Sequence, residues 1–274
     1  MKKWGIFVMI ICMFAGGSCG NSKEQQNENL YVIRTQSGNI TIMLHEETPE
    51  HKNNFEKLVN ENFYEGLLFH RVIPGFMIQG GDPESKTARP GDRLGGGSLD
   101  YTLPAEISDK YYHKRGAVAA ARRGGPSNPE KRSSATQFYI VQGRIFSEGQ
   151  LDTMEMVKNN QIKNELMREH FVAAEQQLQQ FREKNDESGF NIEIARLREQ
   201  VDSLFEAGNM AFKFSPEQRK VYSTVGGYPS LDGEYTVFGE VVEGMDVIEK
   251  ITSAETDTND RPLKDIEMKI ERIN

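Results

Sequence analysis

The sequence predicts a mainly β protein, in which a closed antiparallel barrel is capped by two helices and interrupted by an α-helical insertion. Short runs of β-branched and aromatic residues, separated by turn-forming residues, recur before residue 143 and after residue 227. Two short segments in these parts have the apolar spacing of helices. Between residues 143 and 227 the strand pattern stops. Many short strands with two helices are typical of a barrel with covered ends.

The first predicted elements are a hairpin and a helix. Two β-rich runs, residues 31–33 and 40–44, flank the turn-forming sequence Gln36-Ser37-Gly38-Asn39. Thr48-Pro49-Glu50 then predicts a helix start, with a hydroxyl N-cap, proline at the first helical position and an acid at the positive end of the dipole. An apolar stripe follows at Phe55, Leu58 and Val59.

The most informative segment runs from Phe69 to Asp82. Strand alternation places Arg71 and Ile73 on one face. A Pro-Gly bend is followed by two apolar side chains and an amide, those of Phe76, Met77 and Gln79. One guanidinium beside an apolar cup suits an uncharged, apolar substrate that carries an amide, such as proline in a peptide.

The remaining barrel elements follow a long loop. Residues 80–97 are rich in Gly, Pro and Asp, which predicts loop structure. Near the C-terminal end, residues 235–242 have strand character and residues 245–251 form a short predicted helix. A last strand is indicated by alternating apolar residues at Ile266, Met268 and Ile270.

Residues 143–227 are interpreted as an α-helical insertion, most of it a helical hairpin. A first apolar stripe consists of Ile162, Leu166, Phe171, Ala174, Leu178 and Phe181. Ser188-Gly189 is predicted to break it, and a second stripe consists of Ile194, Leu197, Val201, Leu204 and Phe205. Ser215-Pro216-Glu217 predicts a third, short helix. Because the insertion leaves and rejoins one barrel, its two ends should be close in space, and we expect it to be separable from catalysis on small peptides.

Four segments, in this order, resemble the motifs of the cyclophilins, which are peptidyl-prolyl cis/trans isomerases. They are residues 69–82, Gly116–Arg122 (GAVAAAR), Ser134–Ile140 (SATQFYI) and Leu231–Val241 (LDGEYTVFGEV). The resemblance implies the cyclophilin-like closed barrel and an isomerase that needs no cofactor. The barrel would comprise residues 30–142 and 228–274.

The resemblance also implies roles for individual residues. Arg71, Gln79 and Gln137 would be catalytic, with the two glutamines either anchoring the substrate backbone or holding Arg71 in place. Ordinary hydrogen bonding within the barrel is the alternative for the glutamines. The substrate-binding residues would be Phe76, Met77, Ala121, Arg122, Tyr139, Leu231 and Tyr235. Plain core packing is the alternative for the apolar ones, and Arg122 is equally well read as a solvated charge at the rim.

Three positions depart from the most frequent family pattern. Tyr139 stands where the family usually has phenylalanine, so its hydroxyl must reach solvent or a partner. Ser230 replaces a tryptophan that matters for cyclosporin recognition, which leaves drug sensitivity open. Tyr235 stands where a histidine is often found, and this replacement resembles bacterial members of the family.

The N-terminus resembles a bacterial lipoprotein signal. Lys2 and Lys3 precede a short apolar run, and small residues lead to Cys19. We therefore predict a signal peptide at residues 1–18, lipidation of Cys19, a flexible tether at residues 19–29, and a membrane-anchored protein of the bacterial cell envelope, on its periplasmic side or at the cell surface. A plain secretory signal and a cytosolic protein with an apolar N-terminus are the alternatives.

Composition limits the other partners. The formal net charge of −8 disfavours nucleic acid. The five histidines show no metal-ligand spacing, and no C-x-x-C occurs, so no metal or redox cofactor is predicted. The expected partners are proline-containing unfolded or exported polypeptides, with an unknown protein as a further candidate at the insertion. Two rival functions remain: a non-catalytic module that binds proline-containing segments, and a chaperone that works mainly through the insertion.

Overall fold

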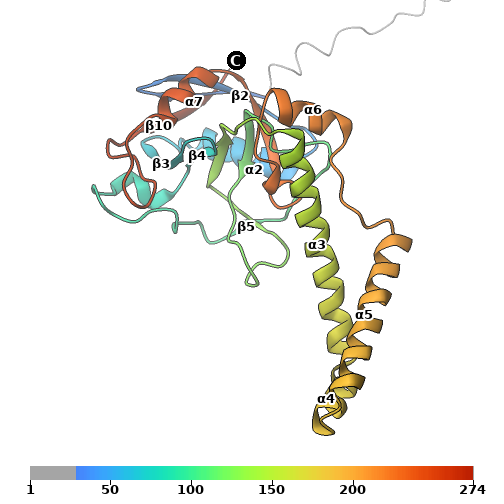
Figure 1. The fold of residues 1–274 in the computed structure, drawn as a ribbon. Coiled ribbons are helices and arrows are strands. Elements are labelled where there is room, and N and C mark those ends of the chain that lie inside the picture. Colours follow the sequence, from blue (N-terminus) through green and yellow to red (C-terminus); the bar gives the residue numbers. More distant parts are fainter. Residues whose placement is uncertain (1–28, 274) are drawn as a thin grey trace, which may run out of the picture.

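The computed structural model describes residues 29–273 and shows a closed barrel of eight antiparallel strands (Figure 1). The strands follow one another around the barrel in the order β1 (Leu30–Thr35), β10 (Glu267–Arg272), β3 (Leu67–Ile73), β4 (Met77–Gly80), β8 (Phe138–Val141), β6 (Ala117–Ala120), β9 (Val237–Glu243) and β2 (Gly38–Leu44). A separate two-stranded ribbon joins β5 (Thr102–Leu103) to β7 (Ser133–Ser134). The predicted fold class is confirmed.

Two helices cap the barrel, as predicted. Helix α2 (Pro49–Asn60) and helix α7 (Met245–Thr252) bury their apolar faces in the same core as the inward-facing strand residues. Alternation along the strands supplies that core. Its fully buried side chains include Tyr31, Ile33, Ile40, Ile42, Ile78 and Ile140.

The start of α2 was predicted correctly, but its predicted hydroxyl cap was wrong. The Thr48 hydroxyl donates to the carbonyl of His45 at 3.2 Å and makes no cap to the helix. The Glu106 carboxylate accepts instead from the backbone N–H groups of Glu50 and His51, each at 3.0 Å. A distant acid therefore satisfies the free donors at the positive helix end.

The predicted loop at residues 80–97 contains a short 3₁₀ helix, η1 (Pro83–Thr87). The buried Asp82 carboxylate fastens this loop by accepting from the N–H groups of Glu84, Gly95 and Gly97. A Cβ at Gly97 would lie 2.0 Å from Asp82 Oδ1, so only glycine fits there. The loop is thus held against the barrel next to β4.

Four helices lie between β8 and β9: α3 (Glu148–Ala173), α4 (Glu175–Glu183), α5 (Glu187–Ala207) and α6 (Pro216–Thr224). Helices α3 and α5 run antiparallel and project away from the barrel (Figure 1). The predicted break at Ser188-Gly189 was wrong, because the chain turns at residues 184–186 and Asp186 caps α5 by accepting from the Gly189 N–H at 2.8 Å. We call residues 160–211 the helical arm.

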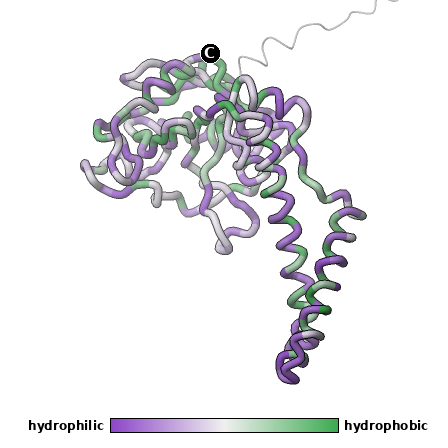
Figure 2. Tube along the Cα trace, viewed as in Figure 1, coloured by the Kyte–Doolittle hydropathy of each residue, from purple (hydrophilic) through white to green (hydrophobic). Residues whose placement is uncertain are grey.

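The apolar stripes of the arm are only partly buried. Leu178, Leu197, Val201 and Phe205 are buried between the helices. Leu204, expected in the second stripe, is 41% exposed. The stripe residues Ile162, Leu166 and Phe171 are half-buried. Hydrophilic residues cover much of the arm (Figure 2), so it is a thin two-helix structure without a thick core.

The base of the helical segment packs on the barrel. Phe146, Leu151, Phe214 and Tyr222 form a separate buried cluster. Reciprocal backbone hydrogen bonds of 3.0 Å join Arg144 to Gly227, which confirms that the two ends of the segment meet. Asn159 marks the limit of the base, because its side chain bonds both backbone groups of Phe212 at 2.7 and 3.1 Å.

No helix within residues 29–273 combines the length and the apolar character that a membrane crossing needs. The predicted signal peptide, Cys19 and most of the predicted tether lie outside the described residues.

Candidate active site

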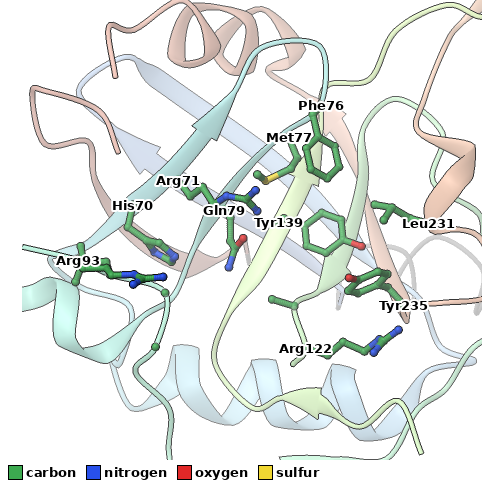
Figure 3. A pocket seen from close by; sticks show the side chains of 14 residues that line it. His70, Arg71, Phe76, Met77, Gln79, Arg93, Arg122, Tyr139, Leu231 and Tyr235 are labelled. Atoms are coloured by element: carbon green, nitrogen blue, oxygen red, sulfur yellow. The ribbon is translucent and has the colours of Figure 1, made fainter. Parts of the chain in front are cut away.

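The predicted site residues surround a cavity of about 550 Å³ on the barrel (Figure 3). Strands β3, β4 and β8, the loop of residues 93–96, the segment just after β6, the 3₁₀ helix η2 (Pro229–Leu231) and the loop before β9 supply the lining. Nine of the ten predicted site residues line this cavity: Arg71, Phe76, Met77, Gln79, Ala121, Arg122, Tyr139, Leu231 and Tyr235. Gln137 lines a neighbouring cavity of about 520 Å³ that shares Gln79 and Arg122 with the first.

Arg71 lies on β3 directly opposite Gln79 on β4. Its guanidinium Nε is 3.5 Å from Asp260 Oδ2, and both side chains are exposed by more than two-fifths, at 41% and 44%. A long, solvated ion pair is weak. The guanidinium is therefore oriented by Asp260 yet remains available to a ligand in the cavity.

The two glutamines bond to each other and to the glycine loop. Gln79 Nε2 donates to Gln137 Oε1 at 3.0 Å, and Gln137 Nε2 donates to the Gly97 carbonyl at 2.7 Å. Among the described residues, no hydrogen bond joins either glutamine to Arg71. Their direct effect in the free protein is to fix the wall beside Arg71.

An apolar floor and wall lie beside Arg71. Met77 and Tyr139 are buried at the floor, at 2% and 4% exposure, while Phe76 and Leu231 are half-buried above them. Phe76 packs on Tyr228 with ring centroids 4.2 Å apart. Sequence reasoning missed Tyr228, although it directly precedes the Pro-Ser-Leu segment that leads to the predicted pocket.

Arg122 is fixed in the wall opposite Arg71. Its Nη2 donates to Glu234 Oε2 at 2.9 Å, its Nε donates to the Glu234 carbonyl at 2.7 Å, and its guanidinium carbon lies 4.7 Å from the ring centroid of Tyr235. The side chain is only 9% exposed. Arg122 thus braces the loop of Glu234 and Tyr235 through a carboxylate and an aromatic face.

The Tyr139 hydroxyl finds a partner, as its burial requires. It lies 2.9 Å from His113 Nε2. Burial raises the pKa of Tyr139 well above its usual value, so the phenol stays protonated. Sequence reasoning missed His113 because no motif surrounds it.

His70 is a further lining residue that the sequence reasoning missed. It is buried beside Arg71, and neither of its ring nitrogens has a hydrogen-bond partner in the described part of the chain. Burial lowers the pKa of His70 to about 4. Its ring is therefore neutral near pH 7, and the cations lining the cavity are arginines: Arg71, Arg93 and Arg122.

Within residues 29–273, no group of three or more His, Cys, Asp or Glu side chains is arranged to hold a metal ion. What the cavity offers is an oriented guanidinium beside an apolar hollow that is large enough for a proline ring.

Comparison with known proteins identifies relatives of this chain. The family model described as "Cyclophilin type peptidyl-prolyl cis-trans isomerase/CLD" matches residues 30–158 and 175–273. A candidate peptidyl-prolyl cis-trans isomerase of Staphylococcus haemolyticus is 27% identical over 247 residues, covering 90% of this chain and 91% of that protein. A candidate isomerase of Staphylococcus aureus strain COL is 28% identical, covering 90% of this chain and 92% of that protein.

A candidate bifunctional phosphatase/peptidyl-prolyl cis-trans isomerase of Streptococcus pyogenes is 30% identical over 239 residues. The match covers 86% of this chain but spans only 36% of the length of that relative. Among solved structures, a cyclophilin-type isomerase of Cryptosporidium parvum, crystallised in the presence of the dipeptide Ala-Pro, is 18% identical with a TM-score of 0.49. That likeness covers 89% of this chain and 98% of the other.

Proposed function

The chain belongs to the cyclophilin-type peptidyl-prolyl cis-trans isomerases, and from this we propose that it isomerises X-Pro bonds of exported polypeptides in the bacterial cell envelope, with Arg71 as the catalytic group. The barrel, residues 30–142 and 228–274, would hold the whole catalytic site. Residues 143–227 would form an added helical domain.

The reaction needs a site that favours a twisted amide. Rotation about an X-Pro bond faces a barrier of about 18–20 kcal/mol, because the amide loses resonance when it is twisted. No covalent bond breaks, so neither a nucleophile nor a base is required. Catalysis requires groups that bind the twisted amide better than either planar form.

The position of Arg71 is the observation that carries the proposal. Its guanidinium lies at the edge of an apolar cavity and is held by a weak pair with Asp260. A donor fixed in advance can stabilise the pyramidal nitrogen or the redistributed carbonyl charge of the twisted amide. Arginine stays protonated at all working pH values and presents its donors in a rigid fork.

The apolar floor would hold the proline ring. Burying its three methylene groups against Phe76, Met77 and Leu231 contributes about 2 kcal/mol. That contact is nearly equal in the planar and twisted forms, so it would set affinity. Arg71 would set the rate, because its contact strengthens as the amide twists.

An isomerase assay on a short X-Pro peptide tests this function. We expect Arg71→Ala to lower kcat/KM about 100-fold, since one preorganised donor is lost, with an unchanged circular dichroism spectrum. Arg34→Ala is the matched control, because Arg34 also pairs with an exposed carboxylate, Glu271, on strands outside the cavity. A folded Arg71→Ala protein with the parental rate would refute the assignment.

The place of action is inferred from the N-terminal sequence. Two lysines, a short apolar run and small residues before Cys19 support export followed by lipidation. An exported polypeptide that folds next to the membrane is then the natural substrate class.

A further inference from the structure

The floor of the cavity is joined to the helical segment by a line of four buried side chains. Tyr139 lies at the floor, and its hydroxyl is 2.9 Å from His113 Nε2. His113 Nδ1 is 2.9 Å from Asp232 Oδ1. Tyr222 of α6 donates its hydroxyl proton to Asp232 Oδ2 at 2.5 Å. None of the four is more than 7% exposed, so water does not compete for these bonds.

The direction of each bond follows from the chemistry of its atoms. A carboxylate only accepts, so His113 Nδ1 carries the proton that is donated to Asp232. With Nδ1–H donating to Asp232, the unprotonated Nε2 accepts a hydrogen bond from the Tyr139 hydroxyl, which keeps its proton. Every donor and acceptor in the line is matched, which is the condition for a buried polar network to rigidify its surroundings.

Asp232 is the fixed point of the line. Its carboxylate also accepts from the backbone N–H of His113 at 2.8 Å, and its carbonyl accepts from Lys158 Nζ of α3 at 3.0 Å. It directly follows Leu231, which lines the cavity. Helices α3 and α6 of the helical segment therefore hold Asp232. Asp232 is bonded through His113 to Tyr139 at the floor and is the chain neighbour of Leu231 in the wall.

We propose that α6 positions the floor of the proline pocket through the relay Tyr222–Asp232–His113–Tyr139. Losing the Tyr222 hydroxyl leaves a buried carboxylate oxygen without its donor. Asp232 and His113 then shift, and the hydroxyl bond carries that shift to the Tyr139 ring. The kinetic part of this inference rests on the proposed isomerase function, whereas the structural coupling does not.

The relay differs from a purely stabilising role in one measurable way. If Tyr222 acts through the Tyr139 hydroxyl, its effect disappears once that hydroxyl is removed. If Tyr222 only stabilises the base of the helical segment, its effect is the same with or without the hydroxyl. A double-mutant cycle separates the two cases.

The cycle compares Tyr222→Phe, Tyr139→Phe and the double variant in the full chain. We expect Tyr222→Phe to lower kcat/KM for an X-Pro peptide about three- to tenfold in the parent and less than about twofold in the Tyr139→Phe background. Tyr112→Phe is the matched control, because Tyr112 packs on Tyr222 with ring centroids 5.6 Å apart and lies outside the relay. It should leave kcat/KM unchanged in both backgrounds.

Fluorine NMR of protein labelled with 3-fluorotyrosine reports the coupling without an activity assay. The Tyr139 resonance is assigned by its absence from the Tyr139→Phe spectrum. It should shift in Tyr222→Phe and in a second variant, His113→Gln, by more than in Tyr112→Phe.

The outcomes separate the two proposals. A parent protein that lacks isomerase activity would overturn the proposed function, while the fluorine signal would still decide the relay. An unshifted Tyr139 resonance, or equal kinetic effects of Tyr222→Phe in both backgrounds, would overturn the relay.

Discussion

Phe76 shows how one side chain can belong to both a pocket and a packed cluster. It is half-buried, packs on the tilted ring of Tyr228 and forms the wall of the cavity next to Met77 (Figure 3). A wall residue of this kind contributes contacts to the ground state and to the transition state alike. Its loss should therefore differ from the loss of Arg71.

We expect Phe76→Ala to weaken peptide binding and to lower turnover together, because ground-state contacts are lost as well as transition-state contacts. Binding is measured by titration with a non-reactive proline peptide, and turnover by the isomerase assay. Phe63→Ala is the control, since Phe63 is a half-buried aromatic packed on the barrel core outside the cavity. A Phe76→Ala protein that unfolds would mean that the residue belongs to the core.

His70 gives the stability of the protein a defined response to acid. Burial lowers the pKa of His70 to about 4, below its usual value of 6.5. As the pH falls through 6.5, the His70 ring binds a proton in the unfolded chain but stays unprotonated in the folded protein until the pH approaches 4. The free energy of unfolding should therefore fall between pH 6.5 and 4, by about 3 kcal/mol at the lower limit.

Denaturant unfolding at pH 6.5 and pH 5.0, above the range in which most carboxylates protonate, measures this dependence. His70→Leu should reduce the loss of stability between these two pH values. Some loss should remain, because burial also lowers the pKa of His45 and of His51. An unaltered pH dependence in His70→Leu would show that the ring accepts a proton in the folded state.

Among single residues, the sequence predicted best those that lie within local motifs. Nine predicted residues converge on one cavity because their strands are neighbours in the barrel. His113 and Asp232, by contrast, are 119 positions apart. Their pairing depends on how the loop before β6 and the turn after η2 meet in the folded chain, which no local pattern encodes.

At the scale of the elements, the helical segment divides into a base and an arm. The base shares its buried cluster with Tyr112 and holds Asp232 through Tyr222 and Lys158. The arm begins where Asn159 clamps Phe212 and then extends into solvent (Figure 1). The sequence predicted that the whole helical segment is separable from catalysis on small peptides. Because the base holds Asp232, we now expect this only of the arm.

We expect a deletion of residues 160–211, closed by a short linker, to stay folded and to turn over a tetrapeptide within about twofold of the parent. Deletion of residues 148–224 should cost more, because it also removes Tyr222 and Lys158. Comparing both proteins on a tetrapeptide and on a long unfolded substrate measures the two contributions. A loss of tetrapeptide turnover on arm deletion alone would mean that the arm builds the site.

Helix starts were predicted with uneven success, and the reason is physical. Ser215 forms the expected cap, accepting from the Gln218 N–H at 3.1 Å while Gln218 bonds back to it. Thr48 also precedes a Pro-Glu pair, yet the free N–H groups at the start of α2 donate to the Glu106 carboxylate and not to the Thr48 hydroxyl. A local cap can be displaced wherever the fold brings a charged acceptor to the same N–H groups.

At the scale of the whole molecule, we predict that a lipid on Cys19 attaches the protein to a membrane. Cys19→Ala should release the protein from the membrane fraction or block its maturation, because it removes the residue that would carry the lipid. A single acyl chain binds a membrane only weakly, so stable anchoring needs the several acyl chains of a lipoprotein. Fractionation of cells and mass spectrometry of the native N-terminus measure this. An unmodified N-terminus would contradict lipidation, and Gln26→Ala, in the predicted tether, serves as a control that keeps the signal and the cysteine.

The barrel also imposes an order on how this protein can be made. Strand β1 pairs along its length with β10, so that Tyr31 lies opposite Arg272. The seam therefore closes only when the last strand becomes available, after every other strand has been synthesised. Until then β1 and β3 expose unpaired edges. If the chain is exported N-terminus first, it would therefore remain unfolded during translocation, because the barrel cannot close before β10 has crossed the membrane. The arrival of β10 would then set the time at which the barrel folds.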